Sequence, residues 1–251
     1  MHVKVRSVIA PLLAAATMAA VIGAVVVTPD TALAANGAAN ARGTTATTQA
    51  PAASISEEEA AGIVFMREEE KLARDVYLTL GDLWGLPIFD NIAASESTHM
   101  AAILGLMETY GLEDPVDVDN IGTFENAELQ HLYDDLIAMG SQSVEAALEV
   151  GAIIEEVDIV DIEEYLAGTT AADIARVYEN LLRGSRDHLR AFVSQLEDLG
   201  VDRDPYLLDI DTYEAIVGSD AERGGSSAET GSTDGNNGGG SEQGSGGAKR
   251  S

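Results

Sequence analysis

Apolar residues recur every three or four positions through the middle of the chain, which is the spacing of helices that bury one face. The pattern predicts a first helix over residues 57–85. Ser56 followed by Glu59 predicts a capping box at its start, and Gly85 with Pro87 predicts its end. The apolar stripe of this helix consists of Ile63, Met66, Ala73, Tyr77, Leu80 and Trp84.

The same spacing predicts a second long helix over residues 88–111, which Gly111 ends. Its apolar stripe consists of Phe89, Ile92, Ile103, Leu106 and Tyr110. A loop then leads into a short amphipathic helix over residues 127–140, and a third long helix is predicted over residues 143–168.

A fourth long helix is predicted over residues 171–200, with Thr169 or Thr170 as its N-cap. Its apolar stripe consists of Ile174, Val177, Leu181, Phe192 and Leu199. Residues 201–217 are expected to pack back over the domain as a short arm. No strand-like alternation competes with this pattern, so the sequence predicts an all-α four-helix bundle with a longer connection between its second and third long helices.

Each long helix carries an ionisable residue on its core-facing stripe; Glu70, for example, continues the line of Met66 and Ala73. The inward-facing ionisable residues are Glu70, Glu96, His99, Glu155, Asp158 and His188. Burying charges without partners costs several kcal/mol each. Because this set contains no permanent positive charge, a bound metal ion is the compensation that we predict.

Each of these residues also has an ordinary explanation when it is taken alone. Glu70 can pair with Arg74 one turn on, and His99 can be a hydrogen-bonded core histidine. Glu155 lies in the acidic run 155–164, which can form a solvated face. A metal site explains all four helices together, and oxygen and imidazole ligands without sulfur suit iron, manganese or zinc.

The charge and the cysteine content narrow the partners of the protein. The net charge of −29 argues against nucleic acid or an anionic membrane surface. The chain has no cysteine, so disulfides and thiolate metal ligands are excluded. We therefore expect metal ions as partners, no nucleic acid and no membrane insertion of the mature chain, which is a monomer or a homodimer.

Residues 1–34 resemble a signal peptide, because Lys4 and Arg6 precede a long apolar run. Ala32 and Ala34 supply the small-x-small pattern of a cleavage site. We expect cleavage after Ala34 and export to the cell envelope or the medium. An uncleaved membrane anchor is the alternative, since the apolar run is long enough to span a bilayer.

Two further segments lack the composition of a folded core. Residues 35–53 are small and polar without a period and predict a flexible linker. Residues 218–251 are rich in glycine and serine and predict a disordered acidic tail. One folded domain remains, over residues 54–217.

At its inward-facing polar residues the sequence resembles the ferritin-like superfamily. The stretch "EKLARDVY", residues 70–77, is similar to the first-helix signature of rubrerythrins. The stretch "SESTHM", residues 95–100, resembles the Glu-x-x-His of their second helix. More narrowly, residues 57–215 resemble a family of exported ferritin-like domains whose function is not established.

This resemblance implies an antiparallel bundle in which carboxylates bridge two iron ions that react with oxygen or peroxide. The ligands implied by position are Glu70, Glu96 as the bridge, His99, Glu155 and His188, with Glu156 or Asp158 in place of Glu155 if the register differs. Ser185 departs from the family pattern, because it stands where a second Glu-x-x-His has its glutamate. The departure implies an asymmetric pair of ions or a single ion, with Asp158 as a substitute ligand.

The connection after the second helix partly matches a calcium-binding loop. Its matching positions are Asp117, Asp119, Gly122, Glu125 and Glu128. Ile121 stands where an oxygen ligand is needed, so the alternative is an acidic loop with a glycine turn. His131 on the short helix is expected to face solvent, and the inward Tyr77 and Tyr110 either fill the core or relay electrons.

The leading hypothesis is an exported ferritin-like protein with a carboxylate–histidine centre of the di-iron type, with manganese or zinc as other metals. Its expected chemistry is oxidation of ferrous iron or reduction of peroxide. The first alternative is a non-enzymatic secreted or surface module that binds metal structurally or mediates interactions. A third hypothesis is a scavenger that takes up metal reversibly.

Overall fold

The computed structural model describes residues 55–221. The predicted signal peptide, the linker and all but the first four residues of the predicted tail lie outside the described residues. Within residues 55–221 the chain is helical and contains no strand, as the sequence predicts. The helices are α2 (Glu57–Trp84), α3 (Pro87–Tyr110), α4 (Ala127–Gly140), α5 (Val144–Gly168), α6 (Ala172–Asp198) and α7 (Ile210–Val217).

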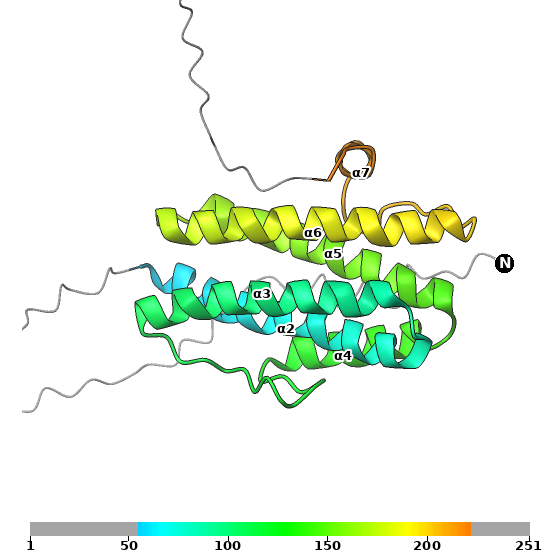
Figure 1. Ribbon diagram of the computed structural model, residues 1–251. Helices are drawn as coiled ribbons and strands as arrows, with labels where there is room; N and C mark the ends of the chain where they lie inside the picture. Colours follow the sequence, from blue (N-terminus) through cyan, green and yellow to red (C-terminus); the bar gives the residue numbers. More distant parts are fainter. Residues whose placement is uncertain (1–54, 222–251) are drawn as a thin grey trace, which may run out of the picture.

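Two long helical hairpins lie side by side and form a bundle (Figure 1). The first hairpin consists of α2 and α3, and the second of α5 and α6. The hairpins meet where α2 contacts α5 and where α3 contacts α6, while α4 packs against α2 and α5. The observed helix bounds agree with the predicted ones to within two residues.

The ends of the helices show which capping predictions are correct. The capping box is confirmed, because Ser56 Oγ accepts from the Glu59 N–H at 3.0 Å and Glu59 Oε2 accepts from the Ser56 N–H at 2.9 Å. Gly85 ends α2 in the left-handed conformation that favours glycine. The predicted threonine cap of α6 is wrong: Ala171 is its N-cap and gives no side-chain bond.

Glu59 binds the turn that contains those two threonines. Its second oxygen, Oε1, accepts from the Thr169 hydroxyl at 2.7 Å and from the Thr170 N–H at 2.9 Å. One glutamate therefore caps α2 and also fixes the turn between α5 and α6.

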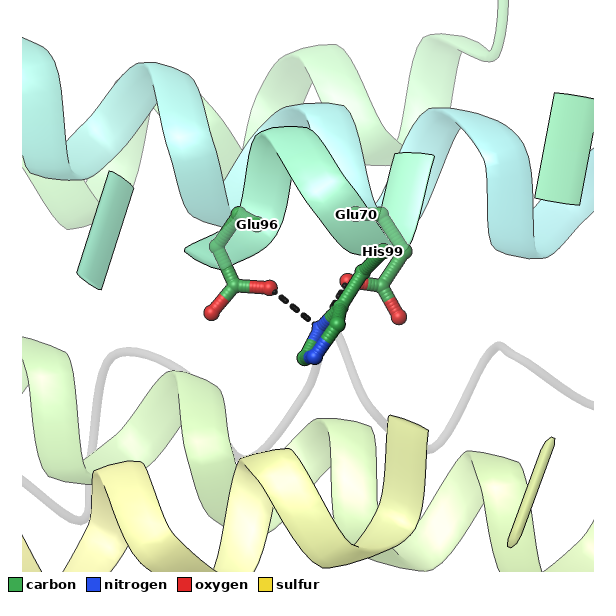
Figure 2. Close-up of side chains that lie close together, drawn as sticks. All are labelled: Glu70, Glu96 and His99. Carbon is green, nitrogen blue, oxygen red and sulfur yellow. Dashed lines mark hydrogen bonds and ion pairs between the residues drawn. The ribbon is translucent and has the colours of Figure 1, made fainter. Parts of the chain in front are cut away.

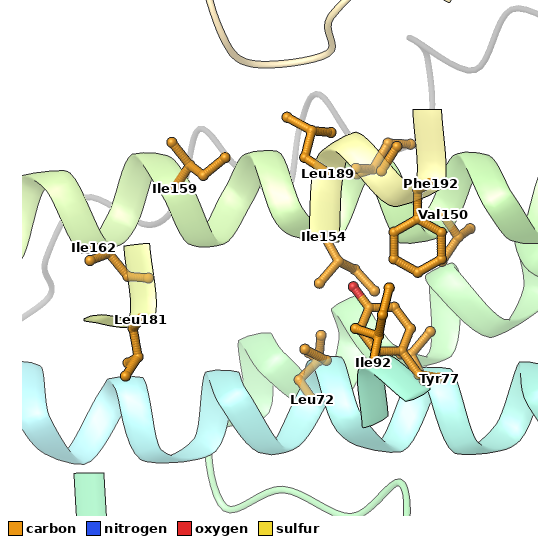
Figure 3. Packing of buried hydrophobic residues seen from close by; sticks show 14 of the residues in the cluster. Leu72, Tyr77, Ile92, Val150, Ile154, Ile159, Ile162, Leu181, Leu189 and Phe192 are labelled. Carbon is orange, nitrogen blue, oxygen red and sulfur yellow. The ribbon is translucent and has the colours of Figure 1, made fainter. Parts of the chain in front are cut away.

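The predicted apolar stripes form the core, in which Tyr77 and Phe192 pack together (Figure 3). Gly151 on α5 makes room for the Phe192 ring, which would collide with any side chain at that position. Leu199 is a wrong core prediction: α6 ends at Asp198, and Leu199 lies beyond it with half of its surface exposed.

Charged side chains of α2 hold the connection between α3 and α4. The apolar spacing of α2 did not predict this role. The Lys71 ammonium donates to Asp75 Oδ2 at 2.5 Å and to the carbonyl oxygens of Asn120 and Thr123 at 2.9 and 3.1 Å. Gly122 donates its N–H to the same Asp75 oxygen at 2.9 Å. A buried ammonium therefore supplies the positive charge in the loop that resembles a calcium site.

The arm after α6 packs back over the bundle, which confirms that prediction. Glu156 on α5 accepts three backbone N–H bonds from it, donated by Tyr206, Leu207 and Leu208 at 2.8, 2.8 and 3.0 Å. Arg203 adds an ion pair to the same carboxylate at 2.7 Å. Within residues 55–221, the helices are too short or too polar for any of them to cross a membrane.

We predict that Glu59→Gln lowers the free energy of unfolding by about 1 kcal/mol at neutral pH, the usual contribution of a helix cap. A backbone hydrogen bond from Ser56 and a hydroxyl bond from Thr169 lower the pKa of Glu59 from 4.5 to about 2. Because the folded pKa is lowered, the charged form contributes fully above about pH 4.5 and is lost as the pH falls towards 2. Urea unfolding at several pH values measures this effect.

The matched control for that experiment is Glu58→Gln, since Glu58 is an exposed carboxylate in the same helical turn. Equal stability losses in the two variants at neutral pH would show that Glu59 acts only through its charge near the helix end.

Candidate metal centre

Three side chains from the first hairpin converge in the interior: Glu70 from α2, and Glu96 and His99 from α3 (Figure 2). His99 Nδ1 lies 3.1 Å from Glu70 Oε2 and 2.8 Å from Glu96 Oε2. Glu96 and His99 share a face because residues three apart on a helix are neighbours. We call this group the first half-site.

A second group joins the two hairpins and uses the same glutamate. It consists of Glu96, Glu155 from α5 and His188 from α6. His188 Nδ1 lies 2.8 Å from Glu96 Oε1 and 3.5 Å from Glu155 Oε2. We call this group the second half-site. Glu96 therefore turns one carboxylate oxygen towards each histidine.

The short contacts of Glu96 are not aligned as hydrogen bonds. Both Glu96 oxygens, Glu155 Oε2 and His188 Nδ1 are buried without a hydrogen-bond partner. Atoms that are close together without pointing at one another are typical of ligands that point at a common ion. A cation with bonds of about 2.1 Å at right angles holds neighbouring ligand atoms about 3 Å apart. The donor set and its spacing therefore fit a metal ion in each half-site.

The histidine side chains are about one tenth exposed, whereas the three glutamates are almost completely buried. The two imidazole rings stack with their centroids 5.6 Å apart. The histidines, which come from α3 and α6, are therefore the part of each half-site that is accessible to solvent.

The buried carboxylates of the centre shift the pKa values of Glu70 and both histidines towards the protonated forms. Burial raises the pKa of Glu70 to about 8, against the lowering effect of His99. Burial alone would lower the pKa of His188, but Glu155 and Glu96 raise it to about 10. Burial likewise opposes the rise of the His99 pKa, yet Glu70 and Glu96 raise it well above its usual value. Without a metal ion, protons on both histidines supply the missing positive charge.

The pKa of Glu96 is shifted downwards, because its carboxylate lies between the two imidazoles. Burial would raise its pKa, but the charge of His99 and the contact with His188 lower it far below the usual value. This carboxylate is therefore an anion whether protons or metal ions balance it.

The structure separates the other predicted ligands from the centre. Glu156 is bonded to the arm and lies outside both half-sites. Asp158 also lies outside them, and with Glu69 it lines a small cavity beside Leu132 and Leu136 of α4. Ser185 is buried on the stripe of His188 but donates its hydroxyl to the Leu181 carbonyl at 3.2 Å. Arg74 pairs with Asp75 rather than with Glu70.

Sequence reasoning missed two residues at the centre. Ser95 Oγ lies 2.9 Å from His188 Nε2, across the seam between α3 and α6. Gly184 faces His99, where a Cβ would lie only 2.5 Å from Nε2. Each contact joins two different helices, so the spacing of residues along one helix could not predict it.

The two tyrosines predicted to face inward differ in their contacts. Tyr77 donates its hydroxyl to Glu155 Oε1 at 2.5 Å, whereas Tyr110 donates to Asp173 away from the centre.

Comparisons with known proteins give a family and a similar protein of known structure. Residues 59–220 match a family described as an uncharacterised protein domain, DUF2202. The chain is 51% identical over 174 residues to the uncharacterised protein MJ0754 of Methanocaldococcus jannaschii, which covers 69% of this chain and 94% of that protein. The crystal structure of hypothetical protein MJ0754 aligns with a TM-score of 0.67 at 49% identity, over 70% of this chain and all of that one.

We predict that Gly184→Ala destabilises the fold by about 1–3 kcal/mol, because the added methyl group forces the His99 ring out of its place. Gly105→Ala on α3 is the matched control, since a methyl group added there would meet no atom within 4 Å. That control is expected to gain about 0.5–1 kcal/mol from helix propensity. Chemical unfolding measures both, and a gain in stability by both variants would contradict close packing of His99 on Gly184.

Proposed function

Because the chain belongs to the DUF2202 family, whose description assigns no activity, we propose a function from the buried centre. The domain is a ferritin-like bundle that binds two metal ions through Glu70, Glu96, His99, Glu155 and His188. The observation that carries this proposal is the pair of overlapping half-sites in which each oxygen of Glu96 faces a different histidine.

The order of the ligands along the chain supports the ferritin-like arrangement. The first hairpin contributes one glutamate from α2 and a Glu-x-x-His pair from α3. The second hairpin contributes Glu155 from α5 and His188 from α6, and Ser185 takes the place of the second glutamate. Di-metal carboxylate proteins of the bundle type place their ligands on four helices in this way.

Oxygen and imidazole donors suit iron, manganese or zinc, and bundles with this kind of ligand set hold iron or manganese, so iron is the metal that we propose. Bound ferrous ions would supply one electron each, so that two of them can reduce one peroxide molecule, with two protons, to two water molecules. The residues of the chain hold the ions: Glu96 joins the two positions, Tyr77 fixes one oxygen of Glu155, and the apolar core excludes bulk water.

Export is part of the proposal and is supported by the signal-like segment over residues 1–34. A centre of this kind in the cell envelope meets metal ions and oxidants before they enter the cell. The net charge of −29 attracts cations to the surface of the protein.

One observation favours a second function, a non-enzymatic module that binds metal only structurally. Ser185 occupies the fourth-helix position that matches Glu96, and its hydroxyl is bonded to its own helix. The centre therefore has one bridging carboxylate. Peroxide consumption by the protein loaded with ferrous iron separates the two functions: the enzyme reduces one peroxide molecule per pair of ions and turns over when an added reductant restores ferrous iron, and the structural module does neither.

We predict that the purified protein binds about two iron or manganese ions per chain, one for each half-site. Glu96→Ala is expected to abolish binding of both ions, because it removes the shared ligand, while His99→Ala or His188→Ala abolishes binding of one. Elemental analysis after gel filtration measures the stoichiometry. His131→Ala is the control, since His131 is exposed on α4; equal metal content in all variants would refute the proposal.

We predict that the apparent metal affinity rises with pH. His188, with its pKa raised to about 10, and Glu70, with its pKa raised to about 8, both carry protons at neutral pH. A metal ion must displace those protons when it binds. For each proton released, the logarithm of the affinity constant rises by about one per pH unit. Calorimetry in buffers of different ionisation enthalpy counts the protons; an affinity independent of pH would contradict this account of the centre.

A further inference from the structure

The two half-sites differ in the support that their ligands receive from the rest of the protein. We propose that the second half-site binds the first metal ion, and binds it more tightly, because Ser95 and Tyr77 hold His188 and Glu155 in the binding orientation. This inference rests on the proposed function and adds to it an order of filling and two positioning residues.

Ser95 fixes the orientation of His188. Its hydroxyl lies 2.9 Å from Nε2, so the ring directs Nδ1 towards Glu96 Oε1 at 2.8 Å. When Nε2–H donates to the Ser95 hydroxyl, Nδ1 carries the lone pair that an ion needs. Ser95 precedes the shared Glu96 on α3, so the same helical turn positions a ligand and orients a histidine from the other hairpin.

Tyr77 fixes Glu155 in a similar way. Its fully buried hydroxyl donates to Oε1 at 2.5 Å, which leaves Oε2 facing His188 without a hydrogen bond. The Tyr77 ring is itself held by contacts with Phe89 and Phe192. The carboxylate thus presents one free oxygen to the second half-site.

The first half-site lacks comparable support. Glu70 and His99 bond to each other, with His99 Nδ1 at 3.1 Å from Glu70 Oε2, and an ion bound by this nitrogen must replace that bond. Across residues 55–221, the structure shows no hydrogen bond from either side chain to a residue outside the centre. His99 Nε2 instead lies against Gly184, which has no side chain to accept a hydrogen bond.

Preorganised ligands lose less freedom on binding, and removal of an outer partner of a metal-bound histidine typically lowers affinity about 10- to 100-fold. The difference in support between the half-sites therefore predicts two binding steps of unequal affinity. The tighter step belongs to the half-site that contains His188.

Anaerobic titration of the full chain with cobalt(II), followed by visible absorption, tests this order. The wild-type protein is expected to bind two ions in separate steps. Ser95→Ala is expected to weaken the tighter step about 10- to 100-fold, and Ser95→Thr, which keeps the hydroxyl, to restore it. Tyr77→Phe is expected to weaken the same step. Ser97→Ala is the matched control, because that exposed hydroxyl donates to the Ala93 carbonyl within α3.

A pair of ligand variants identifies which half-site fills first. His188→Ala is expected to abolish the tight step, and His99→Ala to leave it in place. Loss of the tight step in His99→Ala, or an unchanged tight step in Ser95→Ala, would overturn the order of filling while leaving metal binding intact. Absence of cobalt binding by the folded wild-type protein, with folding checked by circular dichroism, would instead refute the proposed function.

Discussion

The Glu96 carboxylate and the two imidazoles that face it are the constraint on which the rest of the structure depends. An anion at the centre of a bundle is stable only where positive charge lies close on every open side. One oxygen of Glu96 faces a histidine of its own helix, and the other faces a histidine of the opposite hairpin. The two hairpins must therefore meet in one relative position for this charge to be balanced.

Two other buried charges of the domain, Lys71 and Glu156, are balanced within the chain, in contrast to the half-sites. Lys71 is surrounded by a carboxylate and two loop carbonyls, so the connection after α3 is fixed without any ligand. Glu156 receives three backbone N–H bonds and an arginine, so the arm is fixed in the same way. The half-sites retain buried atoms without hydrogen-bond partners, which is the state that a cation completes.

The family and its solved relative carry no description of activity, so the chemistry of the side chains is the basis of the functional proposal. The two hairpins place similar ligands, but the second lacks one carboxylate, and the surroundings of the ligands differ. Ser185 leaves the fourth helix without a bridging carboxylate, and Ser95 and Tyr77 support one half-site alone. An asymmetric pair of half-sites follows, because the two hairpins contact different neighbours.

By itself, the sequence determined the helices, their approximate ends and the polar residues on their inner faces, because all of these follow from helical periodicity along one segment. It placed Glu70, Glu96, His99, Glu155, Asp158 and His188 on inner faces, where all six are buried, but it did not show that Asp158 lies outside the half-sites. Only the tertiary structure decided which of them meet and which neighbours support them. Ser95, Gly184 and Lys71 act across helices or on a distant loop, where the packing of whole elements sets each distance.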